Sequence, residues 1–329
     1  MKKILHFCLF GLILMSSKAF GQGDVDVEQI LRAGAKDLNT YMGYYVEPAA
    51  KGFIYSMGSG WAQTAKPHST LGFDIKFGLG AASVPSKHES FTFDPNEYDK
   101  LRLINANGPT ELPTLFGATE TNSSLGIYED GELIAEVEVP PGIDIPVKYV
   151  PAPTIQAALG LPAGFELVGR FIPELKIDDA KVSQWGLGIK HDIKQHIPGL
   201  KLLPFDLSAL AAYNHLKSSY IIDETENQHG KMNVESWTFQ GIISKKLSII
   251  TFYGAFGYNT GKSAYSVLGD YYVEGVSEPL TDPVDLKYEI AGAMGTLGLR
   301  FKFGPIFLNG DYTFQEYNTI NVGLGVSIR

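Results

Sequence analysis

The last forty residues alternate between apolar and polar side chains with a period of two. From Thr319 to Ile328 every second residue is Ile, Val or Leu, and Thr, Asn, Gly and Ser stand between them. Residues Leu297–Phe303 and Ile306–Phe314 repeat the pattern. Because successive side chains of a strand point to opposite faces and short connections join antiparallel neighbours, the chain ends in antiparallel strands with one apolar and one polar face.

The same alternation recurs upstream, most clearly in Leu71–Gly80. Strands of about 9–11 residues with aromatic residues toward their ends are typical of outer-membrane barrels. We count ten strands directly, and twelve if the polar region 95–150 supplies a pair. The sequence therefore predicts an all-β fold, an antiparallel transmembrane β-barrel of 10–12 strands, even in number, with a short N-terminal helical segment. The remaining predicted strands are Thr154–Leu161, Phe165–Ile177, Val182–Ile193, Phe205–Tyr213, Asn233–Ser244, Ser248–Asn259 and Tyr288–Phe303.

The N-terminus has the pattern of a secretory signal peptide. Lys2 and Lys3 precede an apolar run, and Ala19-Phe20-Gly21 supplies a small-x-small cleavage site. We expect residues 1–21 to be removed. Because this segment carries three lysines and no acid, the formal charge of −9 becomes −12 after cleavage. An acidic exported chain is a poor candidate for binding nucleic acid. The single cysteine, Cys8, also lies here, which excludes disulfides and thiolate metal sites from the mature chain.

Residues 22–66 are predicted to form a helical plug or cap at the periplasmic mouth, and residues 67–329 the barrel. Asp24–Met42 has helical spacing, and Ala49–Tyr55 is a possible second helix. The alternative is an arm that packs on the barrel base. Within the barrel, residues 95–150 read as a large external loop with one hairpin around Asp130-Gly131. The plug candidates are Val27, Ile30, Leu31 and Leu38.

Connection lengths give the barrel an orientation. Outer-membrane barrels have short periplasmic turns and longer external loops. The tight connections at 161–164, 245–247 and 304–305 fall on one side, and the long ones at 218–231 and 260–287 fall on the other. The long connections are therefore expected outside the cell.

The polar parity of the strands places both signs of charge inside the barrel, where a narrow lumen would bring them within pairing distance. One interpretation is a salt-bridged interior that keeps the barrel rigid; the other is a polar path for a solute. The lumen-lining candidates are Asp74, Lys76, Glu166, Arg170, Glu174, Lys176, Lys190, Asp192, Asp206, Arg300 and Lys302.

Signals for catalysis or metal binding are weak. Residues 257–263 resemble a phosphate loop but have three residues between the glycines where four are needed. His191 and His196 are five apart near a turn, and Ser218 and His215 precede acidic residues without the order of a triad. We expect no enzyme, no metal and no cofactor. Pro173 on an outward position of a closed barrel predicts a bulge.

Several motifs carry a resemblance to known proteins. Glu47–Gly52 with Gly60–His68, Gly169–Pro173, Gly188–Ile193 and Leu203–Asp206 resemble an uncharacterised outer-membrane β-barrel family of the Bacteroidota. The helical segment before the first strand is more distantly similar to the FadL-type long-chain fatty-acid transporter barrels, which have fourteen strands. The first resemblance implies a bacterial outer-membrane location and no particular activity.

Together these patterns predict an integral outer-membrane barrel that acts as a channel or transporter for a small molecule of unknown identity, which a FadL-like path would make hydrophobic. The alternative is a non-transporting structural or surface-interaction barrel, and a third possibility is an outer-membrane enzyme. The expected surroundings are outer-membrane lipid and lipopolysaccharide, and the expected partners are the barrel-assembly and periplasmic chaperone machinery.

Overall fold

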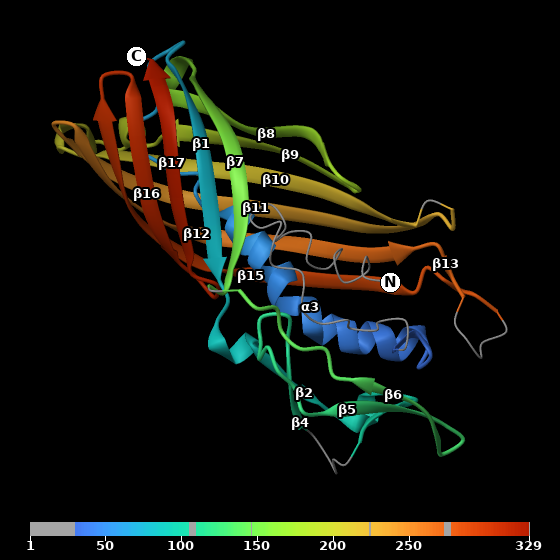
Figure 1. The fold of residues 1–329 in the computed structure, drawn as a ribbon. Helices are drawn as coiled ribbons and strands as arrows, with labels where there is room; N and C mark the ends of the chain where they lie inside the picture. The colour runs from blue at the N-terminus through green and yellow to red at the C-terminus, as the bar shows by residue number, and fades with distance from the viewer. Residues whose placement is uncertain (1–29, 105–109, 146, 224, 273–277, 329) are drawn as a thin grey trace.

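A closed antiparallel barrel dominates the computed structural model, which describes residues 30–104, 110–145, 147–223, 225–272 and 278–328. Ten strands of this described part form the barrel in the order β1-β17-β16-β15-β12-β11-β10-β9-β8-β7 (Figure 1). Strand β1 closes it, since β1 pairs with both β17 and β7. The predicted fold class is confirmed, at the lower of the two expected strand numbers. The predicted signal peptide, residues 1–21, and Val27 lie outside the described residues.

The barrel strands differ about twofold in length. They are β1 (Phe73–Ser83), β7 (Tyr149–Gly160), β8 (Phe165–Ile177), β9 (Ala180–Asp192), β10 (Asp206–Asp223), β11 (Gln228–Leu247), β12 (Ile250–Leu268), β15 (Val284–Phe303), β16 (Ile306–Phe314) and β17 (Thr319–Ile328). At one end, which we call the turn end, two residues join β11 to β12 and two join β15 to β16. The opposite, loop end carries the long connections 84–148 and 269–283.

The four longest strands extend past the others at the loop end (Figure 1). The sequence predicts loops at 218–231 and 260–287, but most of these residues continue β10, β11, β12 and β15. Many of their outward side chains are polar or charged, as in the cross-strand ion pair of Lys262 with Glu289 at 2.6 Å. The strands thus continue after their outward face has changed from apolar to polar. Because these polar residues were assigned to loops, the predicted strand ends were too early.

Below this charged zone an apolar belt surrounds the barrel. Its centre includes Phe256, which is 72% exposed, and Leu297, which is 63% exposed. A row of aromatic rings bounds it toward the loop end, with Tyr213 between Trp185 and Trp237 at centroid separations of 5.2 and 4.9 Å. From Trp237 to the next outward charge on β11 is eight residues, about 26 Å along the strand. That matches the apolar band of about 25 Å on transmembrane barrels.

The bulge predicted at Pro173 is confirmed. The register between β8 and β9 shifts between Ile172 and Leu175. A proline has no backbone N–H to give to a neighbouring strand, so the ladder skips it. The shift also reverses which face the following residues present, with consequences for the candidate site.

Residues 84–148 form a small folded platform at the loop end rather than mostly surface loop. The expected hairpin is confirmed as β5 (Ser124–Glu129) and β6 (Glu132–Glu138), to which β3 (Leu101–Leu103) adds a strand. A second sheet pairs β2 (Ser90–Phe93) with β4 (Thr110–Pro113). Apolar residues of both sheets share one core with the helix and with the extensions of the long strands. The remaining short elements are β13 (Asp270–Tyr271), β14 (Leu280–Thr281) and the 3₁₀ turns Ser86–His88, Pro95–Glu97, Pro162–Gly164, Lys194–His196 and Leu200–Leu202.

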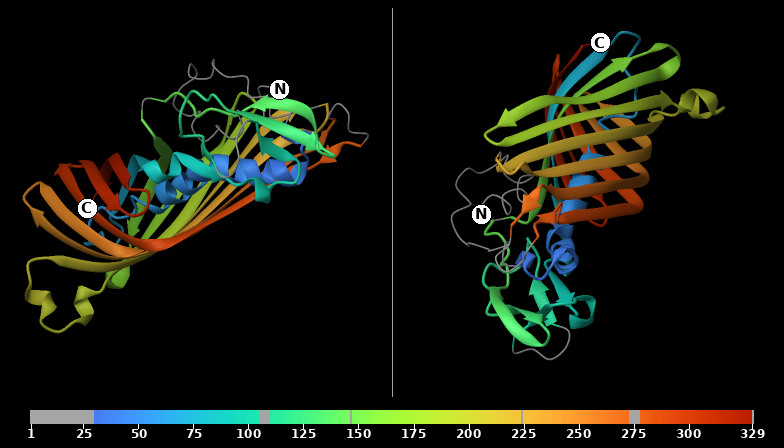
Figure 2. Two further views of the ribbon diagram at one scale, coloured as in Figure 1. Left: turned by 90° about the horizontal axis from the view of Figure 1, so that it is seen from below. Right: turned by 90° about the vertical axis from the view of Figure 1, so that its right-hand side faces the viewer.

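One continuous helix, α3 (Ala35–Gly58), includes the end of the predicted helix Asp24–Met42 and the whole possible second helix Ala49–Tyr55. It is about 36 Å long and continues through Pro48 because the barrel and platform bury it on most sides. Its first turns lie at the loop end and its last turn lies inside the barrel (Figure 2). The expected position at the turn end is therefore wrong; the chain enters the lumen from the loop end and crosses it to reach β1. None of the described helices is long and apolar enough to cross a membrane.

Candidate functional site

The lumen holds the C-terminal half of α3 and the segment 59–69, which we call the lumen segment. The helix packs against β1, β7, β10, β11, β12 and β15. The lumen segment contains Trp61, whose ring lies against Gly186 and Gly188 of β9. A Cβ atom at Gly186 would lie 3.1 Å from that ring, so the wall is smooth where the tryptophan packs. The barrel interior is thus filled by its own chain.

Arg170 of β8 binds the C-terminal end of α3. Its two terminal nitrogens donate to the carbonyl oxygens of Met57 and Ser59, both at 2.8 Å, and its Nε donates to Gln156 at 3.0 Å. The guanidinium also stacks on Trp61, 3.8 Å from the ring centroid. The last carbonyls of a helix lack partners within it and carry partial negative charge. The helix has no basic residue in its last turn, so the barrel wall supplies the cation.

A second charged cluster fixes the lumen segment near the turn end. The backbone N–H of His68 donates to Glu166 at 2.8 Å, and its ring contacts the same carboxylate at 2.8 Å. Lys190 pairs with Glu166 at 2.6 Å, and Asp74 lies 3.4 Å from His68 and 3.3 Å from Arg300. All five side chains are buried. This pairing matches the interpretation of a salt-bridged interior, with the lumen segment included in it.

Side chains on other strands complete the attachment. Thr238 donates to the carbonyl oxygen of Gly58 at 2.8 Å, and Lys76 donates to that of Gly60 at 2.9 Å. Ser244 accepts from the backbone of Ala65 at 2.9 Å. The attachment therefore involves strands on several sides of the barrel, and it consists of polar contacts to backbone more than of apolar packing.

Part of the wall facing the lumen carries buried polar atoms without a hydrogen-bond partner in the described structure. They belong to β10, β11 and β12 and include the hydroxyl groups of Ser208 and Ser236, Oε1 of Gln240 and both amide atoms of Asn259. A buried polar group without a partner is costly and is normally satisfied by protein or ordered water. This side of the lumen therefore carries hydrogen-bonding groups that the described part of the chain leaves unsatisfied.

The structure brings most of the lumen-lining candidates inside. Asp74, Lys76, Glu166, Arg170, Lys190 and Arg300 are buried, and Asp192, Asp206 and Lys302 are half-buried near the turn end. Glu174 and Lys176 are exposed instead, because they follow the bulge at Pro173 near the outer end of the β8–β9 hairpin.

The plug candidates occupy a different place from the one expected. Ile30, Leu31 and Leu38 are buried in the core that the helix shares with the platform. Sequence reasoning did not find the lumen segment or its neutral anchors, such as Thr238 and Ser244. The inward parity of these residues was a usable signal, but only charged residues were counted.

The remaining candidates are not assembled into a site. Ser218 and His215 lie on opposite faces of β10, because their numbers differ in parity. Nε2 of His191 lies 2.9 Å from Nε2 of His196, but no three His, Cys, Asp or Glu side chains of the described residues come together as a metal site. The residues that resemble a phosphate loop lie within β12 and open no helix.

Comparisons with solved structures find other bacterial barrels. The outer-membrane protease OmpT from Escherichia coli aligns with a TM-score of 0.34 and 9% identity over 80% of this chain and 97% of that one. The translocator domain of the autotransporter NalP from Neisseria meningitidis gives 0.32 and 11% over 80% and 90%. The toluene transporter TodX from Pseudomonas putida gives 0.26 and 10% over 85% and 76%. Likenesses this distant identify no function.

No curated protein matches the sequence. One family model matches residues 1–328, so the chain belongs to the family of unknown function DUF6588.

Proposed function

We propose that this protein is an integral barrel of the bacterial outer membrane that is closed at rest by its own N-terminal segment and presents its platform for surface interactions. The location is supported by the apolar belt between the aromatic row and Lys245, the next outward charge on β11, and by the paired charges of the interior. In this location the barrel is surrounded by outer-membrane lipid and lipopolysaccharide. Its partners are periplasmic chaperones and the barrel-assembly machinery. We also propose that the chain is related to outer-membrane barrels of the Bacteroidota and, more distantly, to FadL-type transporters.

The observation that carries the closed state is the attachment of the lumen segment. Arg170 holds the end of α3, and Glu166 holds His68 at the other end of the segment. The platform core is continuous with the helix, which makes α3 a rod that fixes the platform to the barrel. A rigid platform above a filled barrel suits binding to another surface better than free diffusion of solutes.

A second function, gated passage of a small polar molecule, is favoured by the unpartnered atoms on β10, β11 and β12. Displacement of the lumen segment would free this wall, and the segment is held mostly by hydrogen bonds that water can replace. This is the channel predicted from the sequence, with a gate added.

Paired cysteines can separate the two functions, because the mature chain has no cysteine of its own. The hydroxyl oxygens of Thr64 and Ser244 are 3.2 Å apart and join the lumen segment to β11. Those of Thr296 and Thr313 are 3.0 Å apart and join two wall strands. The test pair is Thr64→Cys with Ser244→Cys; the control pair is Thr296→Cys with Thr313→Cys. Each is reconstituted in planar bilayers and in swelling assays, oxidised and reduced.

For a barrel closed at rest, we expect no sustained current from the wild type or from either pair in either redox state. If passage is gated, the wild type takes up solute. Oxidation of the test pair should abolish this uptake and reduction should restore it, whereas the oxidised control pair should keep it. A steady current from the wild type that survives oxidation of the test pair would refute the closed barrel.

A further inference from the structure

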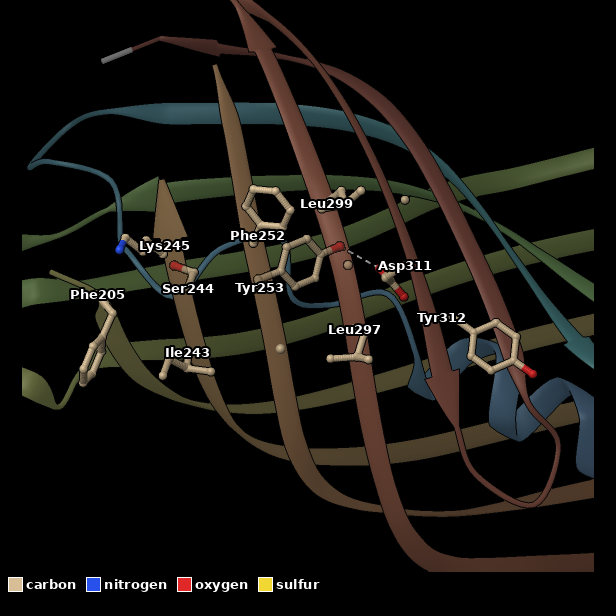
Figure 3. Close-up of a pocket in the computed structure, with 13 residues that line it drawn as sticks. Phe205, Ile243, Ser244, Lys245, Phe252, Tyr253, Leu297, Leu299, Asp311 and Tyr312 are labelled. Carbon is tan, nitrogen blue, oxygen red and sulfur yellow. Dashed lines mark hydrogen bonds between the residues drawn. The ribbon is translucent and has the colours of Figure 1, made fainter. Parts of the chain in front are cut away.

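An apolar groove lies on the outer face of the barrel near the turn end, across β11, β12, β15 and β16 (Figure 3). Its volume is about 810 Å³. Outward side chains form its walls, among them Ile243, Phe252 and Leu297, which are between 47% and 63% exposed. The groove therefore opens toward the surroundings of the barrel and not toward the lumen.

Two glycines, Gly254 and Gly310, make the groove deep. Both occupy outward positions, where their neighbours along the strand carry large apolar side chains. A Cβ atom at Gly254 would come no closer than 3.5 Å to any neighbour, and one at Gly310 no closer than 3.7 Å. These are ordinary contacts, so nothing in the packing requires glycine at either position. What the glycines provide is open space.

A lysine stands at the edge of the groove nearest the turn end. Lys245 lines it, is exposed, and has Phe252 as its cross-strand neighbour on β12. The interactions of the described residues include no ion pair or hydrogen bond of its ammonium group. Lys246 follows directly, but it has the opposite, inward parity, so Lys245 is the lysine at this edge of the groove. An unpaired cation beside an apolar groove complements a molecule with an acyl chain and an anionic head.

We propose that this groove binds one anionic glycerophospholipid, with an acyl chain over Gly254 and Gly310 and the phosphate at Lys245. The choice of phospholipid rests on the proposed outer-membrane orientation, in which the turn end faces the periplasmic leaflet. A second outer groove of about 830 Å³, lined by Ala209, Gly241 and Phe256 among others, has no lysine in its lining. It provides an internal reference for apolar contact alone.

The test is native mass spectrometry of the mature protein in detergent, titrated with dioleoylphosphatidylglycerol, with dioleoylphosphatidylcholine or with lipid A. A lysine near an anionic lipid surface contributes on the order of 1 kcal/mol, which is about a fivefold preference. We expect the wild type to prefer the first phosphatidylglycerol molecule by about that factor, and Lys245→Gln to lose the preference. Gly254→Leu with Gly310→Leu should weaken the binding of both lipids.

The matched control is Gly241→Leu, which fills the reference groove and should change neither affinity. A wild type without preference, or a preference that survives Lys245→Gln, would overturn the proposal. So would selective binding of lipid A in place of phosphatidylglycerol. Circular dichroism and the heat-dependent gel shift are recorded for every variant, so that failure to form a barrel, which would count against the proposed function, is distinguished from loss of the lipid.

Discussion

A single arginine on the wall decides how the helix ends inside the barrel. A helix C-terminus buried away from water needs donors for its last carbonyls, and here the helix sequence provides none. Arg170 supplies two of them from a strand more than a hundred residues later. The parity of β8 predicts that Arg170 points inward, but its partners depend on where α3 stops, which is a tertiary property. The sequence therefore predicts the residue and not its role.

Replacement of Arg170 should loosen the lumen segment. We expect Arg170→Ala to lower the free energy of local opening by roughly 2–4 kcal/mol, because the buried carbonyls of Met57 and Ser59 lose charged donors. The measurement is maleimide labelling of Ala62→Cys, a buried position of the segment, which should become about 30-fold faster or more. Arg170→Lys keeps the charge but cannot donate to both carbonyls in the same way. Its labelling rate should lie between those of the wild type and Arg170→Ala. Equal labelling in all three backgrounds would show that Arg170 does not hold the segment.

Glu316, in the connection between β16 and β17, joins three parts of the loop end. It accepts hydrogen bonds from Tyr55 of α3 and from Lys87, both at 2.9 Å. Partial burial raises the pKa of Glu316, but the hydrogen bonds from Lys87 and Tyr55 outweigh it, and the net pKa is lowered. A carboxyl group with a lowered pKa stabilises the folded state above its unfolded pKa, near 4.3, and this contribution is lost as the pH falls through the folded pKa.

The melting temperature in detergent should therefore show the contribution of Glu316 as a function of pH. We expect Glu316→Gln to have a lower melting temperature than the wild type at pH 7. The loss of unfolding free energy should be at most about 1 kcal/mol, because the side chain is partly exposed. The difference should shrink as the pH falls below the unfolded pKa and through the lowered folded pKa. Glu289→Gln, which breaks the exposed pair with Lys262, is the control and should have no comparable effect. A difference that does not change as the pH falls would contradict the linkage.

At the scale of elements, alternation predicts strands well only where the outward face is apolar. β8 has the bounds expected from sequence, Phe165–Ile177. β11 and β12 are longer than expected, because beyond the belt the outward face becomes polar and the inward face becomes apolar, as at Val234 and Val267, while the hydrogen bonding continues. The bounds of α3 could not be predicted for a related reason: a helix enclosed by a barrel and a platform is buried on most sides, and no single apolar stripe marks its ends.

The joint between α3 and the platform depends on one buried carboxylate. Asp37 accepts backbone hydrogen bonds from Asp99, Lys100 and Leu101 at 2.7–2.8 Å. Asp37→Ala would leave three N–H groups without that acceptor, at roughly 1–3 kcal/mol for each one that stays buried. We expect amide hydrogen exchange at residues 99–101 to accelerate at least tenfold, while the exchange of the barrel strands stays unchanged. Asp37→Asn, which keeps an acceptor oxygen, should accelerate it less. Unchanged exchange in Asp37→Ala would locate the joint elsewhere.

For the whole molecule, two environments succeed one another along the same strands. Near the turn end the wall is apolar outside and charged inside; beyond the aromatic row it is charged outside and apolar inside, where it packs against α3 and the platform. This reversal explains how one chain can have a polar lumen and a hydrophobic core within a single barrel. It also predicts that an outward charge destabilises the inserted barrel by an amount that depends on its position between the turn end and the loop end.

Phe256 is the residue at which that dependence should be greatest. It lies at the centre of the belt, paired with Gly241 and Gly295, while Asn233 faces outward on the same wall beyond the aromatic row. We expect Phe256→Arg to destabilise the membrane-inserted barrel by roughly 2–4 kcal/mol, and Asn233→Arg by about 0–1 kcal/mol. The measurement is urea titration of folding into lipid vesicles, followed by the gel-mobility shift of the folded barrel. Equal costs at the two positions would mean that the belt does not contact hydrocarbon, and a wild type that stays folded without detergent or lipid would lead to the same conclusion.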